Sequence, residues 1–220
     1  MMADVLIRTY ESRDYDAVRA LFARGMVDYL PSTCKYLLRL RRVHLIILAS
    51  FITFYLVFRS LFMSSLGVVA LLAGGRLLLI LVFQNVINKA HKKDLQNIEE
   101  SYMLRQNACF WVAETNGQVV GMVGVQPVPG SCYDVVLRRL SVAKDHQHKG
   151  IATTLCRHVV DFARHRGYKH VTLNTSTIQH AAHKLYLNMG FRKTRSKKIS
   201  NFFGRLAKAS ITYYSYDIQT

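Results

Sequence analysis

Val142-Ala-Lys-Asp-His-Gln147-His-Lys-Gly150-Ile-Ala152 joins two segments of different periodicity. An apolar run typical of a strand precedes it, and residues 151–163 repeat apolar side chains at helical spacing. We therefore expect a strand that passes into a helix through a turn. The N-terminus of a helix has free N–H groups and the positive end of the helix dipole, which favour a bound anion. Gly150 lets a ligand approach the backbone because it has no Cβ. The stretch predicts either a phosphate site or an ordinary turn, and it matches neither a Walker A loop nor a dinucleotide fingerprint.

A second motif, Ala182-His-Lys-Leu185-Tyr186-Leu-Asn-Met-Gly190-Phe191, follows one further predicted strand at 169–175. Together, V-x(4)-[RQ]-x-x-G-x-[GA] and A-x-x-L-Y-x-x-x-G-F resemble the acetyl-CoA signature of the GCN5-related N-acetyltransferase (GNAT) superfamily. Two motifs in this order are a stronger signal than each motif alone. Gln147 stands where Arg is frequent and Ala152 where the last Gly is frequent, and both are common variants. The resemblance implies an α/β fold with a mixed sheet (α+β) and acetyl-CoA as co-substrate.

Residues 43–87 form an almost continuous apolar segment. A bilayer is crossed by a helix of about 20 residues, so this length fits two spans. A pair of buried core helices is the alternative, but a domain of this size could hardly cover them. Basic residues flank both ends, as they do on the cytoplasmic side of membrane segments: Lys35, Arg39, Arg41 and Arg42 precede it, and Lys89, Lys92 and Lys93 follow it.

A helical hairpin satisfies these flanks, because the chain then returns to the side from which it entered. The same parity follows if the predicted strand 5–10 belongs to the sheet that forms after the insert. We expect the turn near Ser64–Gly67, or alternatively near Gly74–Gly75. Arg59 then extends to the far interface, whereas Arg76 lies near mid-membrane, where a cation costs roughly 2.5–3.5 kcal/mol. That cost favours a tilted or shallow re-entrant hairpin, or a protein partner for Arg76.

Three parts of the chain are expected. Residues 1–42 hold the first strand and helix, residues 43–87 the membrane hairpin, and residues 88–220 the remainder of the acetyltransferase domain. The hairpin is thus inserted between the first two helices of the fold. A further amphipathic helix is expected at 94–105, a β-hairpin turn at Asn116–Gly117, and late strands at Ile199 and 207–218.

Further motifs are similar to the N-acetyltransferase 8 (camello) family over nearly the whole chain. They are R-x-Y-E-x-R-D-Y from Arg8, F-W-V-A-E from Phe110 and N-G-Q-V-V-G from Asn116, together with the membrane insert. The resemblance implies attachment to the endoplasmic reticulum membrane and acetylation of an amine. Acceptors ascribed to the family are cysteine S-conjugates, aspartate and lysine side chains. The hairpin places the catalytic domain on the cytosolic side.

The composition is strongly basic, with a formal net charge of +17. No nucleic-acid motif accompanies the basic clusters, so nucleic acid is not an expected partner, whereas the lipid bilayer is. The cluster Lys193, Arg195, Lys197 and Lys198 fits a solvated face or a substrate or lipid role equally well. Four scattered cysteines predict neither a metal site nor disulfides, but reduced thiols in a cytosol-facing protein. The oligomeric state stays open.

The resemblance also implies roles for backbone groups. The strand end at Leu140–Val142 is expected to meet the pantetheine arm, and the Val142 N–H to polarise the thioester carbonyl. The following turn is expected to hold the pyrophosphate. The expected cofactor-binding residues are Leu140, Ser141, Val142, Gln147, His148, Lys149, Gly150, Ile151, Ala152, Thr153, Asn174 and Gln179.

Tyr186 is the expected general acid. The resemblance places a tyrosine of this motif beside the CoA sulfur, and an ordinary phenol pKa of about 10 suits protonation of a thiolate. The alternative is a packed aromatic residue beside Phe191. Glu114 or Asp134 is the expected base, directly or through water, although each also fits a surface carboxylate. His146 and His148 are expected to face solvent, and a covalent cysteine mechanism is not expected.

Three functions therefore compete. The first is a membrane-anchored N-acetyltransferase that acts on a small amine such as a cysteine conjugate or aspartate. The second is a lysine acetyltransferase that acts on proteins. The third is a non-catalytic membrane module that binds acyl-CoA.

Overall fold

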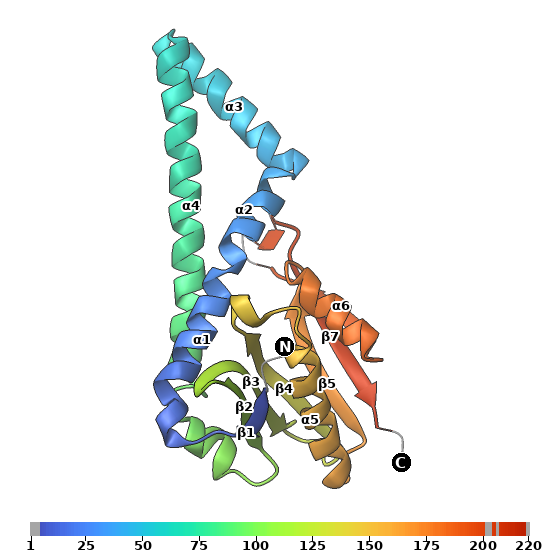
Figure 1. The fold of residues 1–220 in the computed structure, drawn as a ribbon. Coiled ribbons are helices and arrows are strands. Elements are labelled where there is room, and N and C mark those ends of the chain that lie inside the picture. The colour runs from blue at the N-terminus through green and yellow to red at the C-terminus, as the bar shows by residue number, and fades with distance from the viewer. Residues whose placement is uncertain (1–4, 201–203, 206, 219–220) are drawn as a thin grey trace.

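The computed structural model describes residues 5–200, 204–205 and 207–218 of the chain. A twisted sheet with helices on both faces forms the body, and two long helices project from it as an arm (Figure 1). The predicted α/β fold with a mixed sheet is confirmed.

The sheet has seven strands in the order β1-β2-β3-β4-β5-β7-β6. Neighbouring strands are antiparallel except for β4 and β5, which are parallel. The strands are β1 (Leu6–Thr9), β2 (Cys109–Thr115), β3 (Gln118–Pro127), β4 (Asp134–Val142), β5 (His170–Ser176), β6 (Arg192–Lys198) and β7 (Ser210–Asp217). β1 pairs with β2 although the helical arm separates them in the chain, so both ends of the arm return to one sheet.

The turn between β2 and β3 confirms the predicted Asn-Gly hairpin. Asn116 and Gly117 both have positive φ angles, 49° and 75°. This is the backbone that a two-residue type I′ turn requires, and asparagine and glycine adopt it at low cost.

Side chains that alternate along the strands feed two cores. On one face, Trp111 and Ala113 pack with α5 (Ile151–His165) and α6 (His180–Asn188). On the other face, Phe110 and Val112 pack with α1 (Tyr15–Val27) and the lower end of the arm. A further helix, α2 (Tyr29–Leu38), continues from α1 toward the arm (Figure 1).

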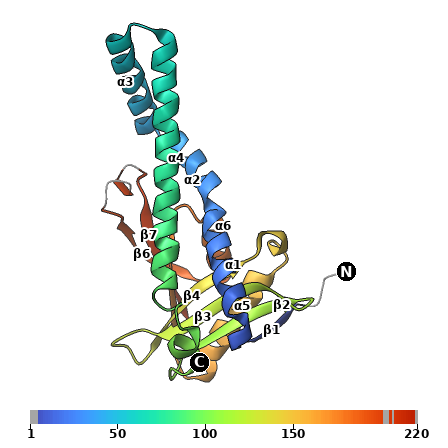
Figure 2. The same ribbon diagram turned by 90° about the vertical axis from the view of Figure 1, so that its left-hand side faces the viewer.

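The arm consists of α3 (Arg41–Phe58) and α4 (Leu61–His91), which meet at the tip of the arm and diverge from each other toward the body (Figure 1 and Figure 2). Both helices are long and apolar enough to cross a membrane, with mean hydropathies of 1.6 and 2.5 over their most apolar windows. These windows are 0% and 6% buried, so the body does not cover them as it would cover core helices. At 1.5 Å per residue, α3 is about 27 Å long, close to the thickness of a hydrocarbon core.

The expected positions of the arm's turn are wrong. The turn lies at Arg59 and Ser60, where Arg59 takes a left-handed backbone with φ of 52° and the Ser60 hydroxyl accepts from the Met63 N–H. Ser64 and Ser65 lie inside α4, where their hydroxyls donate to the carbonyls of the preceding turn. A helix absorbs serine in this way, and Gly67 lies where the helices touch, because a Cβ there would meet the Phe54 ring at 2.6 Å.

The position of this turn changes the expected location of Arg76 along the arm. The residue lies about 22 Å along α4 from Leu61, at 1.5 Å per residue. That length approaches the whole length of α3, so Arg76, the middle residue of α4, lies nearly as far from the turn as the start of α3 does. Beyond it, Phe83, Ile87 and Ala90 are buried, and Ile87 and Ala90 join the core beneath α1. The second helix of the arm therefore serves as a helix of the body as well.

Two other expectations are wrong in part. Residues 94–105 hold only a short π-helical segment, Glu99–Met103, although Leu95 and Ile98 are buried as their spacing predicted. In the C-terminal part, β7 matches the expected strand, but β6 forms over the basic cluster rather than at Ile199. All seven β6 residues are exposed, so this edge strand has no apolar alternation by which to recognise it.

Candidate active site

The strands β4 and β5 pair only at their first residues, Asp134–Val136 with His170–Thr172. Farther along, β4 has no β5 partner, which leaves a gap between the two strands. The Ala143 N–H donates to the Val120 carbonyl at 2.8 Å. Because amides alternate along an antiparallel strand, the Val142 N–H points away from β3 and toward the gap. Leu140 and Ser141 lie beside it, half-buried.

A bulge shapes β4 just before this point. The pairing with β3 shifts between Met122 and Gly124, and Arg139 takes a left-handed φ of 59°. The Arg139 guanidinium donates to Asp94 at 2.9 Å and lies over the Phe22 ring. Burial works against ionised Asp94, but the hydrogen bonds from Arg139 outweigh it and hold the Asp94 pKa below its usual range. The segment that leaves the arm is thereby tied to the bulge.

The turn between β4 and α5 presents a row of free donors. His148 and Gly150 have φ angles of 63° and 82°, and the Gln147 side chain donates to the Val142 carbonyl at 3.1 Å. The first backbone bond of α5 runs from the Thr154 N–H to the Gly150 carbonyl. Within the described part of the chain, no N–H from 148 to 153 has an acceptor. Free backbone donors at the N-terminus of a helix are an arrangement that favours a bound anion.

The space in front of this turn is open. A Cβ on Gly150 would meet nothing within 4 Å, so glycine serves the positive φ and the free approach rather than packing. Lys149 is exposed, and Ala152 and Thr153 are half-buried. The Ile151 side chain is buried and anchors the helix, so this residue offers only its N–H to a ligand.

Tyr186 on α6 is 5% exposed and packs against Phe191 and Tyr214, with ring centroids 5.6 and 5.9 Å away. Burial raises its pKa far above the ordinary phenol value, and nearby Cys156 and Tyr29 add to the shift. Its hydroxyl has no hydrogen-bond partner among the described residues. The ring is therefore packed, and the phenol keeps its proton and an uncommitted donor.

His183 fastens α6 to the sheet. Its Nε2 lies 3.1 Å from the Ser176 carbonyl, and its Nδ1 lies 2.7 Å from the Tyr214 hydroxyl. A carbonyl only accepts, so Nε2 donates, and a neutral ring then accepts from Tyr214. Tyr214 and Tyr29 were not among the predicted site residues, because aromatic residues in a strand and a helix cannot be distinguished from core residues by sequence.

Of the two expected amide ligands, Gln179 is partly committed to the fold. Its Oε1 accepts from the Thr175 hydroxyl at 2.7 Å and from the Ser176 N–H at 3.1 Å, which closes the turn into α6. Asn174 is exposed on β5, opposite Tyr213 of β7, on the part of β5 that β4 has left.

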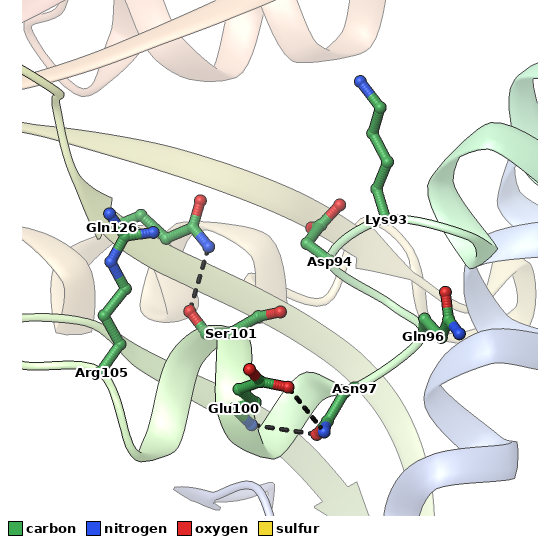
Figure 3. Close-up of a pocket in the computed structure, with 8 residues that line it drawn as sticks. All are labelled: Lys93, Asp94, Gln96, Asn97, Glu100, Ser101, Arg105 and Gln126. Atoms are coloured by element: carbon green, nitrogen blue, oxygen red, sulfur yellow. Dashed lines mark hydrogen bonds between the residues drawn. The ribbon is translucent and has the colours of Figure 1, made fainter.

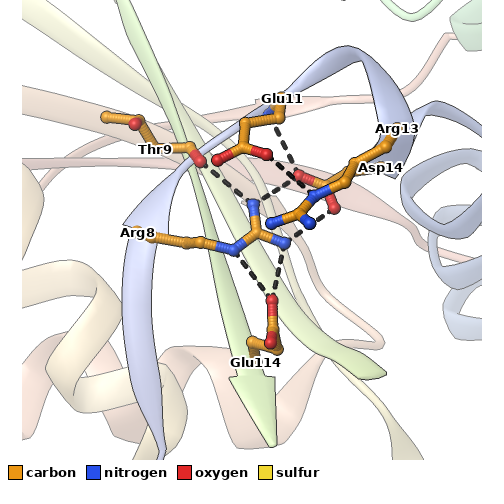
Figure 4. A network of polar contacts seen from close by, with 6 residues as sticks. All are labelled: Arg8, Thr9, Glu11, Arg13, Asp14 and Glu114. Carbon is orange, nitrogen blue, oxygen red and sulfur yellow. Dashed lines mark hydrogen bonds and ion pairs between the residues drawn. The ribbon is translucent and has the colours of Figure 1, made fainter. Parts of the chain in front are cut away.

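Glu114 lies near the end of β2, held by Arg8 of β1 (Figure 4). The Arg8 guanidinium is 2.6 Å from both Glu114 and Asp14. Glu114 of β2 pairs with Val119 of β3. The next residue, Val120, accepts the hydrogen bond from the Ala143 N–H at its carbonyl. The carboxylate is thus on the same end of the sheet as Val142, with one oxygen occupied by Arg8.

Asp134 lies at the opposite end. It opens β4, about 26 Å from Val142 at 3.3 Å per residue. Its carboxylate contacts His170 at 2.7 Å and accepts from Ser131 at 2.8 Å. The structure therefore does not bring Asp134 together with the other expected site residues. Asp134 lies where β4 and β5 are paired, whereas those residues lie toward the other ends of the two strands.

A polar cavity of about 640 Å³ lies elsewhere, between Lys93, Glu100, Arg105 and Gln126 (Figure 3). The Gln126 amide donates to the Ser101 carbonyl across it at 3.1 Å. It contains none of the expected site residues. The candidate site is instead the region where β4 and β5 are no longer paired, with the adjoining start of α5.

Known proteins are similar to this chain in sequence, and others are similar to it in fold. A profile of the acetyltransferase (GNAT) family matches residues 79–191, from within α4 to the end of the second motif. The probable N-acetyltransferase camello of Xenopus tropicalis is 40% identical over 219 residues, which cover 100% of each chain. N-acetyltransferase 8 of Rattus norvegicus is 35% identical, with 99% of each chain covered. 

A solved acetyltransferase of the GNAT family from Staphylococcus aureus Mu50 has a TM-score of 0.60 at 15% identity. The similarity covers 98% of this chain and 100% of that chain, and it shows a common fold. GNAT enzymes use acetyl-CoA. The chain therefore belongs to the GNAT family of acetyltransferases, in the group of the camello and N-acetyltransferase 8 proteins.

Proposed function

We propose that this protein is a membrane-anchored N-acetyltransferase that transfers acetyl from acetyl-CoA to a small primary amine of the cysteine-conjugate or aspartate type. The run of free N–H groups from 148 to 153 carries the proposal. It lies at the positive end of α5, beside a strand whose last N–H points into a gap. The N–H groups of the turn can therefore donate to a diphosphate, and the last N–H of the strand can donate to a thioester carbonyl.

The chain's own residues supply the other parts of the chemistry. When bound, acetyl-CoA provides an acetyl group activated as a thioester. The Val142 N–H stabilises negative charge on the carbonyl oxygen as the amine adds. The Tyr186 phenol gives its proton to the departing sulfur as the carbon–sulfur bond breaks, and it regains a proton from the nitrogen that becomes the amide. Glu114 accepts the ammonium proton through water, since its position near Val142 suits this role better than that of Asp134.

We further propose that α3 and α4 lie in the endoplasmic reticulum membrane with the body in the cytosol. The exposed apolar surfaces of both helices support insertion. The pairing of β1 with β2 supports a hairpin, because it joins the chain before and after the arm in one sheet. Arg59 at the turn reaches the far interface, and the cations at the base meet the cytosolic one.

Topology is checked with epitope tags at the two termini of the full chain in sealed microsomes. We expect protease to remove both tags, because an even number of crossings leaves both ends outside. A tag that is protected while the other is cleaved would contradict the hairpin. Detergent-treated microsomes are the control, since both tags must then be accessible.

Transfer is tested with purified full-length protein, radiolabelled acetyl-CoA and a panel of amines. We expect labelled product from a cysteine S-conjugate or aspartate, and less from a lysine peptide. Preference for the lysine peptide would favour a protein acetyltransferase. Bound acetyl-CoA without transfer to any amine would favour a non-catalytic module.

A further inference from the structure

Acidic residues are missing from two long segments of the chain. There is no Asp or Glu between Asp28 and Asp94, or between Asp161 and Asp217. The first segment contains α2 and the arm, and the second contains β6 and the loop that leads to β7. Cations in these segments therefore have no carboxylate neighbour within their own stretch of chain.

The structure brings the two segments together at the base of the arm. The Tyr36 hydroxyl of α2 donates to the Ala207 carbonyl at 2.9 Å. The Arg42 guanidinium at the start of α3 donates to the Arg205 carbonyl at 3.2 Å. Arg205 and Ala207, between β6 and β7, thus lie against the helices that lead into the apolar arm.

These contacts create a basic surface around the foot of the arm. Its exposed members are Arg39, Arg41, Arg42, Lys197, Lys198 and Arg205. Within the described residues, none of the six has an ion pair with a carboxylate. β6 is also an edge strand, paired only with β7. Cations that are left unpaired in this way are available to an anionic partner.

We propose that this basic surface binds anionic phospholipid headgroups of the membrane that holds the arm. The inference rests on the proposed membrane anchorage and extends it from an apolar hairpin to the body of the enzyme. Each cation close to an anionic leaflet is attracted to it. Six such residues would hold β6 and Arg205 against the leaflet, which fixes how the acetyl-transfer gap faces the membrane.

A membrane suits this surface better than an acidic protein does. The first three cations directly precede the apolar part of α3, so insertion of the arm carries them to the headgroup level. The contacts of Tyr36 and Arg42 hold Ala207 and Arg205 at the same level. An acidic protein would have to enter the space between this surface and the bilayer.

The test places the full chain in nanodiscs of phosphatidylcholine, with or without about 30% phosphatidylserine. Reductive methylation with formaldehyde and an amine–borane reductant, both neutral, reports how accessible each lysine is. We expect Lys197 and Lys198 to react at least about three-fold more slowly with phosphatidylserine, and about 0.5 M salt to reverse the effect. Lys169, exposed near the far end of α5, is the internal control.

Matched variants separate the surface from total charge. Arg42→Ser with Arg205→Ser should reduce the slowing, whereas Arg164→Ser with Arg166→Ser, at the far end of α5, should leave it intact. Equal lysine rates in both nanodiscs, for protein that resists carbonate extraction, would overturn this proposal and spare the anchorage. Protein that carbonate extracts from the membrane would overturn both the anchorage and the proposal about the basic surface. Slowing by a polyglutamate peptide but not by phosphatidylserine would also overturn it, in favour of an acidic protein.

Discussion

Glutamate at position 150 is expected to weaken acetyl-CoA binding by at least about 100-fold, which corresponds to about 2.7 kcal/mol. The new carboxylate would stand among the free N–H groups from 148 to 153, accept their hydrogen bonds and repel a diphosphate. The space in front of Gly150 is open, so nothing in the fold diverts the side chain elsewhere. Equilibrium dialysis with radiolabelled acetyl-CoA measures the change.

Gly167→Glu is the matched control. Gly167 terminates the same helix, has a φ of 74°, and also has no atom within 4 Å of a Cβ. Both variants carry the same strain of about 1–2 kcal/mol for a left-handed residue, and both should lower the melting temperature. Only Gly150→Glu should lose acetyl-CoA affinity. Wild-type affinity in that variant would remove the turn from the cofactor site.

The parts of the fold that were predicted correctly depend on local chemistry. The turn at Asn116–Gly117 needs two residues that tolerate positive φ, and the sequence shows them directly. The start of α5 is marked by Gly150 and by the change from strand to helix periodicity. Such signals involve neighbours in the chain, so they can be read without knowing what packs against them.

The arm shows where local signals fail. Small polar residues from Ser64 to Gly67 interrupt an apolar run, and such an interruption is typical of a turn. In the structure the serine hydroxyls bond to carbonyls of their own helix, and Gly67 accommodates Phe54 of the other helix. The actual turn uses Arg59 in a left-handed conformation, for which arginine has no preference. Contacts between the helices decide the turn, and the sequence does not display them.

The candidate base shows a second limit of sequence reasoning. Glu114 and Asp134 both stand at the end of a strand, and periodicity cannot tell which strand ends meet. Pairing places Glu114 beside the turn that leads to Val142 and sends Asp134 to the far edge. The contact between the Arg8 guanidinium and Glu114 depends on the position of β1, which is more than one hundred residues away in the chain.

The second large expected effect is the loss of kcat when the hydroxyl oxygen of Tyr186 is removed. Tyr186→Phe should lower kcat at least about 100-fold, since a positioned general acid contributes about 10²–10⁴. Acetyl-CoA affinity should change less than about two-fold, because the phenol acts on the departing sulfur rather than on bound thioester. Steady-state rates with a cysteine S-conjugate, together with equilibrium dialysis, separate the two quantities.

Packing makes this substitution a fair test of the phenol. The ring contacts with Phe191 and Tyr214 survive in phenylalanine, and no hydrogen bond within the described residues is lost. Tyr168→Phe, a buried tyrosine at the opposite end of α5, should keep wild-type kcat. Burial raises the Tyr186 pKa above 10.0, so the acid stays protonated and wild-type kcat should show no alkaline decline below about pH 10 from this group. An unchanged kcat in Tyr186→Phe would leave the residue as a packed aromatic and require water as the proton donor.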